Sequence, residues 1–126
     1  MSGRGDLREI GSLGETAVCA LLERQGAEIL CRNYTVRGGE IDVIARLGEW
    51  LLFVEVKTRK TGALVSGAAA VDTKKQRFII RAAEQYLLRF PNDLQPRFDV
   101  AEVEYSGQTV RHITYFPAAF DASDYR

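Results

Sequence analysis

The feature that most constrains the fold is a pair of apolar segments, EIDVIARL at 40–47 and WLLFVEVK at 50–57, separated by Gly48 and Glu49. The first alternates between two faces, as a half-buried strand does, and the second is a continuous apolar run typical of a buried strand. A glycine in the first position of a two-residue loop suits a type II′ turn. The sequence therefore predicts a β-hairpin within the core of the protein.

Four charged residues lie at regular places in this hairpin, namely Glu40, Asp42, Glu55 and Lys57. Pairing outward from the turn puts Asp42 opposite Glu55 and Glu40 opposite Lys57, so all four would share one face. Two opposed carboxylates repel each other, and if they are partly buried they need a neutralising group. A divalent cation that takes oxygen ligands, Mg²⁺ or Mn²⁺, meets that need. The alternative is an exposed charged face on which Asp42 and Glu55 flank a Glu40–Lys57 ion pair.

The remaining segments predict an α/β fold. Apolar periodicity predicts two helices, at 12–25 (with a start as early as Leu7) and 73–90, and three further strands, at 27–36, 97–105 and 110–116. The apolar stripe of the second helix consists of Ile79, Ala82, Ala83, Tyr86 and Leu87. A long loop would fill 58–72, and a Ser106-Gly107 turn would join the last two strands. The order α-β-β-β-α-β-β predicts a mixed sheet flanked by helices.

The size and composition suit one domain. The chain has 126 residues, of which 46% are hydrophobic, so we expect a single domain over 1–126 with its core at about 7–120. No apolar run of membrane-spanning length occurs, and the first residues lack the apolar segment of a secretory signal. Cys19 and Cys31 have no metal-ligand spacing, so we interpret them as free thiols in a reducing compartment. A cytoplasmic location follows as the expectation.

The charge distribution hints at an anionic partner. Residues 57–97 contain nine Lys and Arg against three acids, a net charge of +6 in a chain whose formal net charge is zero. Such a basic segment suits an anionic partner, although an ordinary helix with a solvated basic face is the alternative and is favoured on charge alone.

Two stretches match the capping box of a helix N-terminus. In the first, Ser12 would cap and Glu15 would be its partner, although an acid early in this helix could equally point into the metal site. In the second, Thr73 would cap with Gln76 as its partner, and the helix N-terminus with its neighbouring lysines would suit a phosphate. Solvated lysines are the alternative there.

Several motifs together resemble those of a known family. They are GETA at 14–17, GEID at 39–42, VEVKTR at 54–59, KQ at 75–76 and RFDV at 97–100. The chain resembles the YraN-like family of bacterial proteins from about Gly14 to Phe120. That family is similar to the PD-(D/E)xK restriction-endonuclease-like superfamily, which includes archaeal Holliday junction resolvases. The resemblance implies a restriction-endonuclease-like αβββαβ core with one extra edge strand.

The resemblance also implies site residues. Asp42 matches the superfamily's first metal acid, and Glu55 and Lys57 match its E-x-K acid and lysine. Glu15 matches the first-helix acid of the resolvase branch, and Gln76, beside Lys75, matches a polar residue of the second helix. The superfamily's proline before the first aspartate is replaced by isoleucine in this chain.

The expected function is a Mg²⁺- or Mn²⁺-dependent endonuclease acting on DNA, including branched or otherwise structured DNA. Asp42 and Glu55 would hold the metal with the carbonyl of Val56, Lys57 would position the attacking water, and Glu15 would complete the acidic set. The expected phosphate contacts are Lys60, Lys74, Lys75, Gln76 and Arg77. We expect no membrane association, and a homodimer is left open as an arrangement.

Two alternatives from other classes remain open at this point. One is a non-catalytic nucleic-acid-binding protein on the same fold, and the other is an interaction module whose acidic cluster is structural. Metal binding at Asp42 and Glu55 would separate the nuclease from the interaction module.

Overall fold

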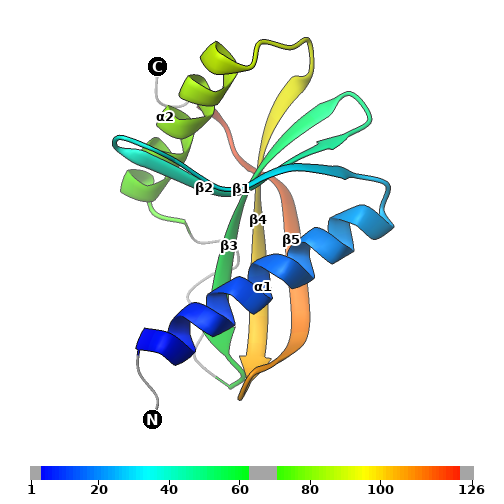
Figure 1. The fold of residues 1–126 in the computed structure, drawn as a ribbon, viewed down its shortest axis with the longest axis vertical. Coiled ribbons are helices and arrows are strands. Elements are labelled where there is room, and N and C mark those ends of the chain that lie inside the picture. Colours follow the sequence, from blue (N-terminus) through cyan, green and yellow to red (C-terminus); the bar gives the residue numbers. More distant parts are fainter. Residues whose placement is uncertain (1–3, 63–70, 123–126) are drawn as a thin grey trace.

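The computed structural model describes residues 4–62 and 71–122. The helices are α1 (Arg4–Arg24) and α2 (Thr73–Arg89), and the strands are β1 (Glu28–Val36), β2 (Gly39–Leu47), β3 (Trp50–Lys60), β4 (Gln95–Ser106) and β5 (Thr109–Phe120). The strands form one sheet in the order β1-β2-β3-β4-β5. All neighbours are antiparallel except β3 and β4, which run parallel because α2 carries the chain back between them. The predicted mixed sheet, with β5 as the extra edge strand, is confirmed (Figure 1).

Each helix covers one face of the sheet, so the protein has two apolar layers (Figure 1). In the α1 layer, Val18 and Leu22 pack on the sheet, and in the α2 layer, Ile79 packs with Phe53. The predicted stripe of α2 is confirmed, because its members are buried except for Leu87, which is partly buried. Because β3 is sandwiched between both layers, its residues 51–55 are all buried. This burial explains the continuous apolar run in the sequence.

Glycine residues with a positive φ form the turns between several elements. Gly48 has φ +60°, whereas Glu49 does not have a positive φ, which matches the predicted type II′ turn. Gly26, just after α1, has φ +96°, as expected of a glycine that ends a helix. The β4–β5 turn falls on Gly107 and Gln108, since Ser106 pairs with Thr109, so the predicted turn was one residue early.

Both predicted capping boxes are wrong. Helix α1 begins at Arg4, so Ser12 lies within the helix and does not cap it. The N-cap of α2 is Asp72, whose side chain accepts a hydrogen bond from the Lys75 backbone N–H at 2.8 Å. Thr73 is therefore the first helical residue, because the preceding aspartate satisfies the free N–H group.

Two further observations concern segment boundaries. Strand β3 continues to Lys60, two residues past the predicted start of the loop at 58–72, because it pairs with β4 as far as Tyr105. Residues 63–70 of that predicted loop lie outside the described residues.

Neither α1 nor α2, the two helices in the described part of the chain, is long and apolar enough to cross a membrane.

The hairpin register is confirmed near the turn and fails farther from it. The β2–β3 ladder runs from Leu47–Trp50 to Val43–Val54, as predicted, and ends there. The predicted pairs Asp42–Glu55 and Glu40–Lys57 would lie beyond it and do not form part of the ladder.

The cause is a break in the alternation of β2 at Asp42. Ile41 packs in the α2 layer and Val43 in the α1 layer, although residues two apart in a regular strand share a face. On β1, Asn33 lies between the partners of these two residues and has a left-handed φ of +52°. The irregularity in β1 and the break in β2 therefore coincide.

Candidate functional site

Asp42 leaves the ladder but stays attached to β3 by its side chain. Its Oδ2 atom accepts a hydrogen bond from the Val56 backbone N–H at 2.8 Å. That N–H would otherwise seek a carbonyl partner on β2, so the carboxylate replaces a ladder bond. Asp42 is thereby fixed at the point where β2 and β3 separate, with a second oxygen available to another group.

Glu55 lies beside Asp42 in an unfavourable position for a charged carboxylate. The residue is only 8% exposed. Burial, followed by the charge of Asp42 and a hydrogen bond to it, raises the pKa of Glu55 to about 8 from an ordinary value of 4.5. The Asp42–Glu55 proximity predicted from the sequence is therefore present, although it does not come from a direct cross-strand pair. At neutral pH the Glu55 carboxyl therefore keeps a proton that a cation could displace.

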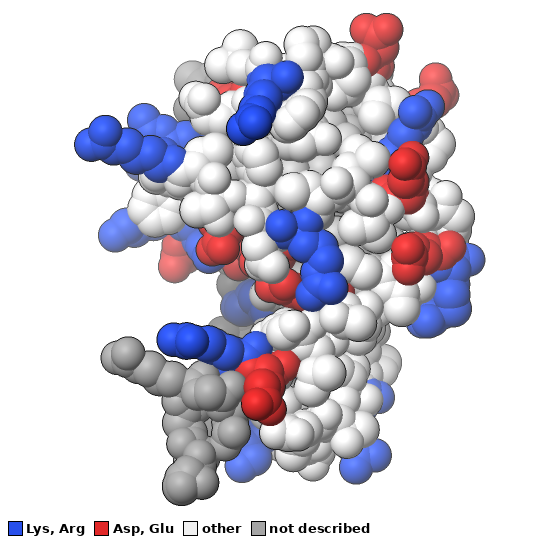
Figure 2. Space-filling model, viewed as in Figure 1, with Lys and Arg blue, Asp and Glu red and all other residues white. Residues whose placement is uncertain are grey.

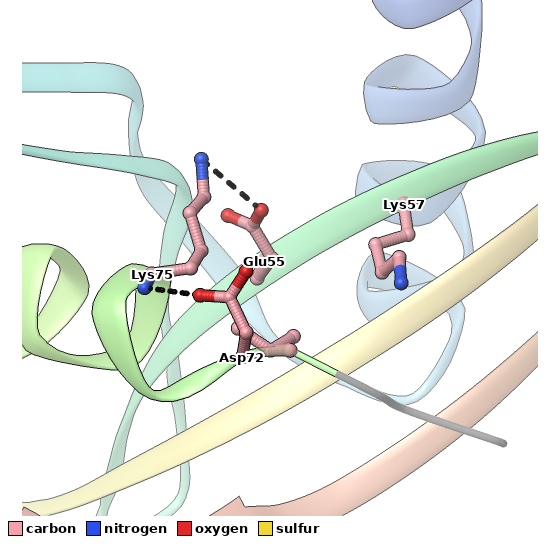
Figure 3. Close-up of a pocket in the computed structure, with 5 residues that line it drawn as sticks. Glu55, Lys57, Asp72 and Lys75 are labelled. Atoms are coloured by element: carbon pink, nitrogen blue, oxygen red, sulfur yellow. Dashed lines mark hydrogen bonds and ion pairs between the residues drawn. The ribbon is translucent and has the colours of Figure 1, made fainter. Parts of the chain in front are cut away.

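Glu55 also opens onto a pocket on the α2 side of the sheet. The pocket is lined by Glu55, Lys57, Val71, Asp72 and Lys75. Lys75 Nζ lies 3.5 Å from Glu55 Oε2, and Figure 3 shows Lys75 reaching from the first turn of α2 to this carboxylate. Lys57 lies to one side, farther along β3 (Figure 3). The predicted E-x-K pair thus lines one pocket together with a second lysine from another element.

Glu15 approaches the site from α1, on the other side of the sheet. Gly14 permits this approach, because a Cβ atom there would lie only 2.8 Å from the Thr58 methyl group on β3. Burial and then the charge of Asp42 raise the pKa of Glu15, against hydrogen bonds from Asn33 and Arg32 that lower it. Arg32 Nη2 lies 3.4 Å from Glu15 Oε1. Glu15 is therefore near Asp42, but its carboxylate is already paired.

Glu40, the fourth charge of the predicted cluster, lies outside the site. It is exposed, and its Oε2 atom accepts a hydrogen bond from Thr35 Oγ1 on β1 at 3.4 Å. The prediction that all four hairpin charges share one cluster is wrong, because the break at Asp42 turns the start of β2 toward β1.

The other predicted phosphate contacts have varied positions. Lys60, Lys74 and Arg77 are exposed, and Lys74 Nζ lies 5.9 Å from the centre of the Phe78 ring. Gln76 turns inward, where its Nε2 atom donates to the Val71 carbonyl at 2.8 Å and fixes the start of α2. Figure 2 shows basic side chains along the side of the molecule where α2 lies, with acidic side chains among them around a notch at mid-height.

Comparison with known proteins identifies the family. The model of "Uncharacterised protein family UPF0102" matches residues 14–103.

The chain belongs to this family.

A UPF0102 protein from Geobacter metallireducens is 43% identical over 115 residues, which cover 90% of this chain and 93% of the relative. One from Syntrophotalea carbinolica is 44% identical over 113 residues, with 89% and 91% covered. One from Alkaliphilus oremlandii is 45% identical over 100 residues, with 77% and 86% covered. The resemblance to the YraN-like family is thus confirmed, and the matched UPF0102 region contains Glu15, Asp42, Glu55 and Lys57.

The RFDV motif of this UPF0102 protein builds a buried network away from the pocket. Asp99 is fully buried and accepts hydrogen bonds at 2.9 Å from Arg97 Nε, Arg97 Nη2 and the Ala118 N–H, and at 2.5 Å from the Tyr115 hydroxyl. Ala118 has φ +51°, so Asp99 holds an irregular part of β5 in place. We assign this motif to the stability of the fold.

Sequence reasoning missed two residues at the candidate site, Arg32 and Asp72. Arg32 neutralises Glu15, and Asp72 both caps α2 and lines the pocket. Asp72 could have been recognised, because aspartate is a preferred N-cap and stands immediately before the helical pattern. The role of Arg32 has no comparable signal, since its partner is 17 residues away on another element.

The donor set at Asp42 and Glu55 fits a hard divalent cation. Carboxylate oxygens suit Mg²⁺, which keeps several waters and needs only one or two protein carboxylates beside substrate phosphates. Within the described ranges, no group of three His, Cys, Asp or Glu side chains is placed to hold a metal. The protein would therefore contribute two carboxylates, and the Val56 carbonyl, water and substrate would supply the remaining oxygens.

Proposed function

We propose that this protein is a Mg²⁺- or Mn²⁺-dependent nuclease that hydrolyses phosphodiester bonds of DNA. The observation that carries the proposal is the meeting of Asp42 and a buried Glu55 where β2 and β3 separate, beside a pocket that contains two lysines. A raised pKa at a buried, paired acid is typical of functional sites. A cation bound to these carboxylates would stabilise the charged form of Glu55 against both the burial and the repulsion by Asp42 that raise its pKa.

The residues would divide the work as follows. Asp42 and Glu55 would hold the cation, and the chemistry that Mg²⁺ supplies in such sites is polarisation of a phosphoryl oxygen and activation of water. Lys57, two residues from Glu55 and in the same pocket, would position the attacking water and stabilise the negative charge that develops on the phosphate. The exposed Lys60, Lys74 and Arg77 would bind phosphates without reading sequence. Glu15 would support the site from α1 through its proximity to Asp42.

One observation favours the alternative of a non-catalytic nucleic-acid-binding protein. Lys75 already supplies a positive charge at Glu55, with 3.5 Å between Nζ and Oε2, so the acid has a partner without a metal. If that ion pair is permanent, the pocket would serve only to fix α2 and its basic side chains for binding.

Cleavage and metal binding measured on the same variants test the proposal. Branched, single-stranded and duplex DNA would be incubated with the protein in Mg²⁺, Mn²⁺ or EDTA. Wild type is expected to cut at least one substrate only with metal, and Asp42→Asn and Glu55→Gln are expected to lose cleavage because each removes a charged ligand. Glu40→Gln is the matched control, since this hairpin acid is exposed and lies outside the pocket, and it should cut like wild type.

The outcomes separate the two candidates. Wild type that binds DNA in EDTA and in Mg²⁺ alike, neither cutting it nor binding the metal, would leave only the non-catalytic alternative. Equal cleavage by all four proteins would show that the activity belongs to a contaminant or to another site.

A further inference from the structure

Lys75 stands out in the pocket because it has an anchored backbone and a displaceable side chain. Its N–H donates to Asp72 Oδ1 at 2.8 Å, so the backbone is fixed by the N-cap of α2. The Lys75 side chain is 43% exposed, whereas the Glu55 side chain with which it pairs is only 10% exposed. Figure 3 shows the Lys75 side chain extending from α2 to this carboxylate. A lysine has a flexible four-carbon stem, so its ammonium can move while its backbone stays in place.

We propose that Lys75 is a counter-ion that a divalent cation displaces from Glu55, after which its ammonium contacts a phosphate of the DNA. This inference rests on the proposed function, because it takes the metal to bind at Asp42 and Glu55. Metal binding at Glu55 would then make the Lys75 ammonium available to a DNA phosphate at the pocket.

Electrostatic repulsion prevents the Lys75 ammonium and a divalent cation from pairing with Glu55 at the same time. The ammonium lies 3.5 Å from a Glu55 oxygen, so a dication bound to the same carboxylate would face a like charge within a few ångströms. Glu55 is buried, whereas the Lys75 side chain is partly exposed, so the ammonium can move away from the carboxylate into solvent. The metal would therefore displace the ammonium from Glu55. By thermodynamic reciprocity, the Lys75–Glu55 ion pair would weaken metal binding by the same factor by which the bound metal weakens the ion pair.

The displaced ammonium of Lys75 could bind a DNA phosphate together with two neighbouring lysines. Lys57 lines the same pocket, and Lys74 is exposed on the neighbouring position of α2. A DNA phosphate held between these lysines would attract a third positive charge. The new ion pair between this phosphate and Lys75 would offset the energy lost when the ion pair with Glu55 breaks. Metal and DNA should consequently bind with positive cooperativity, because each favours the outward position of Lys75.

Metal affinity without DNA tests the inference independently of cleavage. Mn²⁺ would be titrated calorimetrically at pH 8.5, above the pKa of Glu55, into wild type, Lys75→Gln, Lys75→Arg and Lys74→Gln. Lys75→Gln is expected to bind Mn²⁺ about three- to tenfold more tightly, because the competing charge is gone. Lys75→Arg should remain close to wild type. Lys74→Gln is the matched control, since it removes one exposed charge from the same turn and should leave metal affinity unchanged.

DNA affinity supplies the second readout. In the presence of Ca²⁺, which occupies oxygen sites, both glutamine variants should bind DNA more weakly than wild type. In EDTA at the same pH of 8.5, at which Glu55 is ionised, Lys75→Gln should lose much less affinity than Lys74→Gln, because the ammonium of Lys75 is then paired with the Glu55 carboxylate.

The results that overturn the inference differ from those that overturn the nuclease. Unchanged or weaker Mn²⁺ binding by Lys75→Gln, or equal tightening in Lys74→Gln, refutes the displacement while leaving the nuclease intact. A wild type without saturable Mn²⁺ binding refutes both. A wild type that binds Mn²⁺ and shows the predicted Lys75 effects, yet cuts no DNA, supports the displacement and refutes the nuclease.

Discussion

Replacing Glu55 with glutamine should stabilise the metal-free protein, and more so as pH rises. Between about pH 4.5 and 8 the native carboxyl of Glu55 keeps its proton, whereas the same carboxyl in the unfolded chain loses it. The native state then binds more protons, so the contribution of Glu55 to the free energy of unfolding falls as pH rises through this window. Each tenfold difference in proton affinity is worth about 1.36 kcal/mol. The raised pKa of Glu55 therefore predicts a total loss on the order of 3–5 kcal/mol.

Glutamine cannot ionise, so the Glu55→Gln variant should escape this loss. The free energy of unfolding would be measured by urea denaturation in EDTA at pH 5, 7 and 8.5. The stability of the variant relative to wild type should increase from each pH to the next. Glu49→Gln, in the exposed β2–β3 turn, is the matched control and should stay within about 0.5 kcal/mol of wild type. Adding Mg²⁺ at pH 8.5 should narrow the gap, because only wild type keeps both ligands. A difference between Glu55→Gln and wild type that does not change with pH would refute the reasoning.

Three further changes have distinct expected results. Asp42→Ala should destabilise the metal-free protein by about 1–3 kcal/mol in thermal or urea unfolding, because the Val56 N–H loses its acceptor, whereas Asp42→Asn keeps an oxygen there and should cost less. Equal losses in the two variants would contradict this role. Lys57→Ala should retain Mn²⁺ binding in calorimetry but lose DNA cleavage, since the lysine serves the transition state, and loss of the metal would contradict that assignment. Asp99→Ala should lose about 3–5 kcal/mol of stability, because the partly buried Arg97, the Tyr115 hydroxyl and the Ala118 N–H all lose their acceptor, and a loss below about 1 kcal/mol would show that the network is dispensable.

The parts of the fold that were predictable depend on neighbours in the sequence. The β2–β3 turn is fixed by Gly48, which adopts a positive φ without strain, and the first pairs of the ladder follow from it. The buried stripe of α2 follows from helical periodicity. The extent of β3 was underestimated, because its last residues pair with Tyr105 on a strand that returns only after α2.

The candidate site was predictable in its residue types and less so in its geometry. An acid on each hairpin strand, with a lysine two residues after the second, is visible in the sequence and is found around one pocket and its edge. Glu40 was placed wrongly because the prediction continued a regular ladder through Asp42. The left-handed Asn33 on β1 interrupts the regular pairing there, and an asparagine in a strand pattern does not reveal in advance which conformation it adopts.

The sequence by itself determined the hairpin, the two amphipathic helices and the acids available for a metal, since turns and periodicity act over a few residues. Only the tertiary structure decided that Glu55 is buried, that its pKa is raised, and that Lys75 is its partner. Burial requires both apolar layers to close over β3, and the ion pair requires α2 to return across the sheet. Electrostatic energies depend on distance and solvent access in three dimensions, so residues 20 positions apart acquire their chemistry only when the chain has folded.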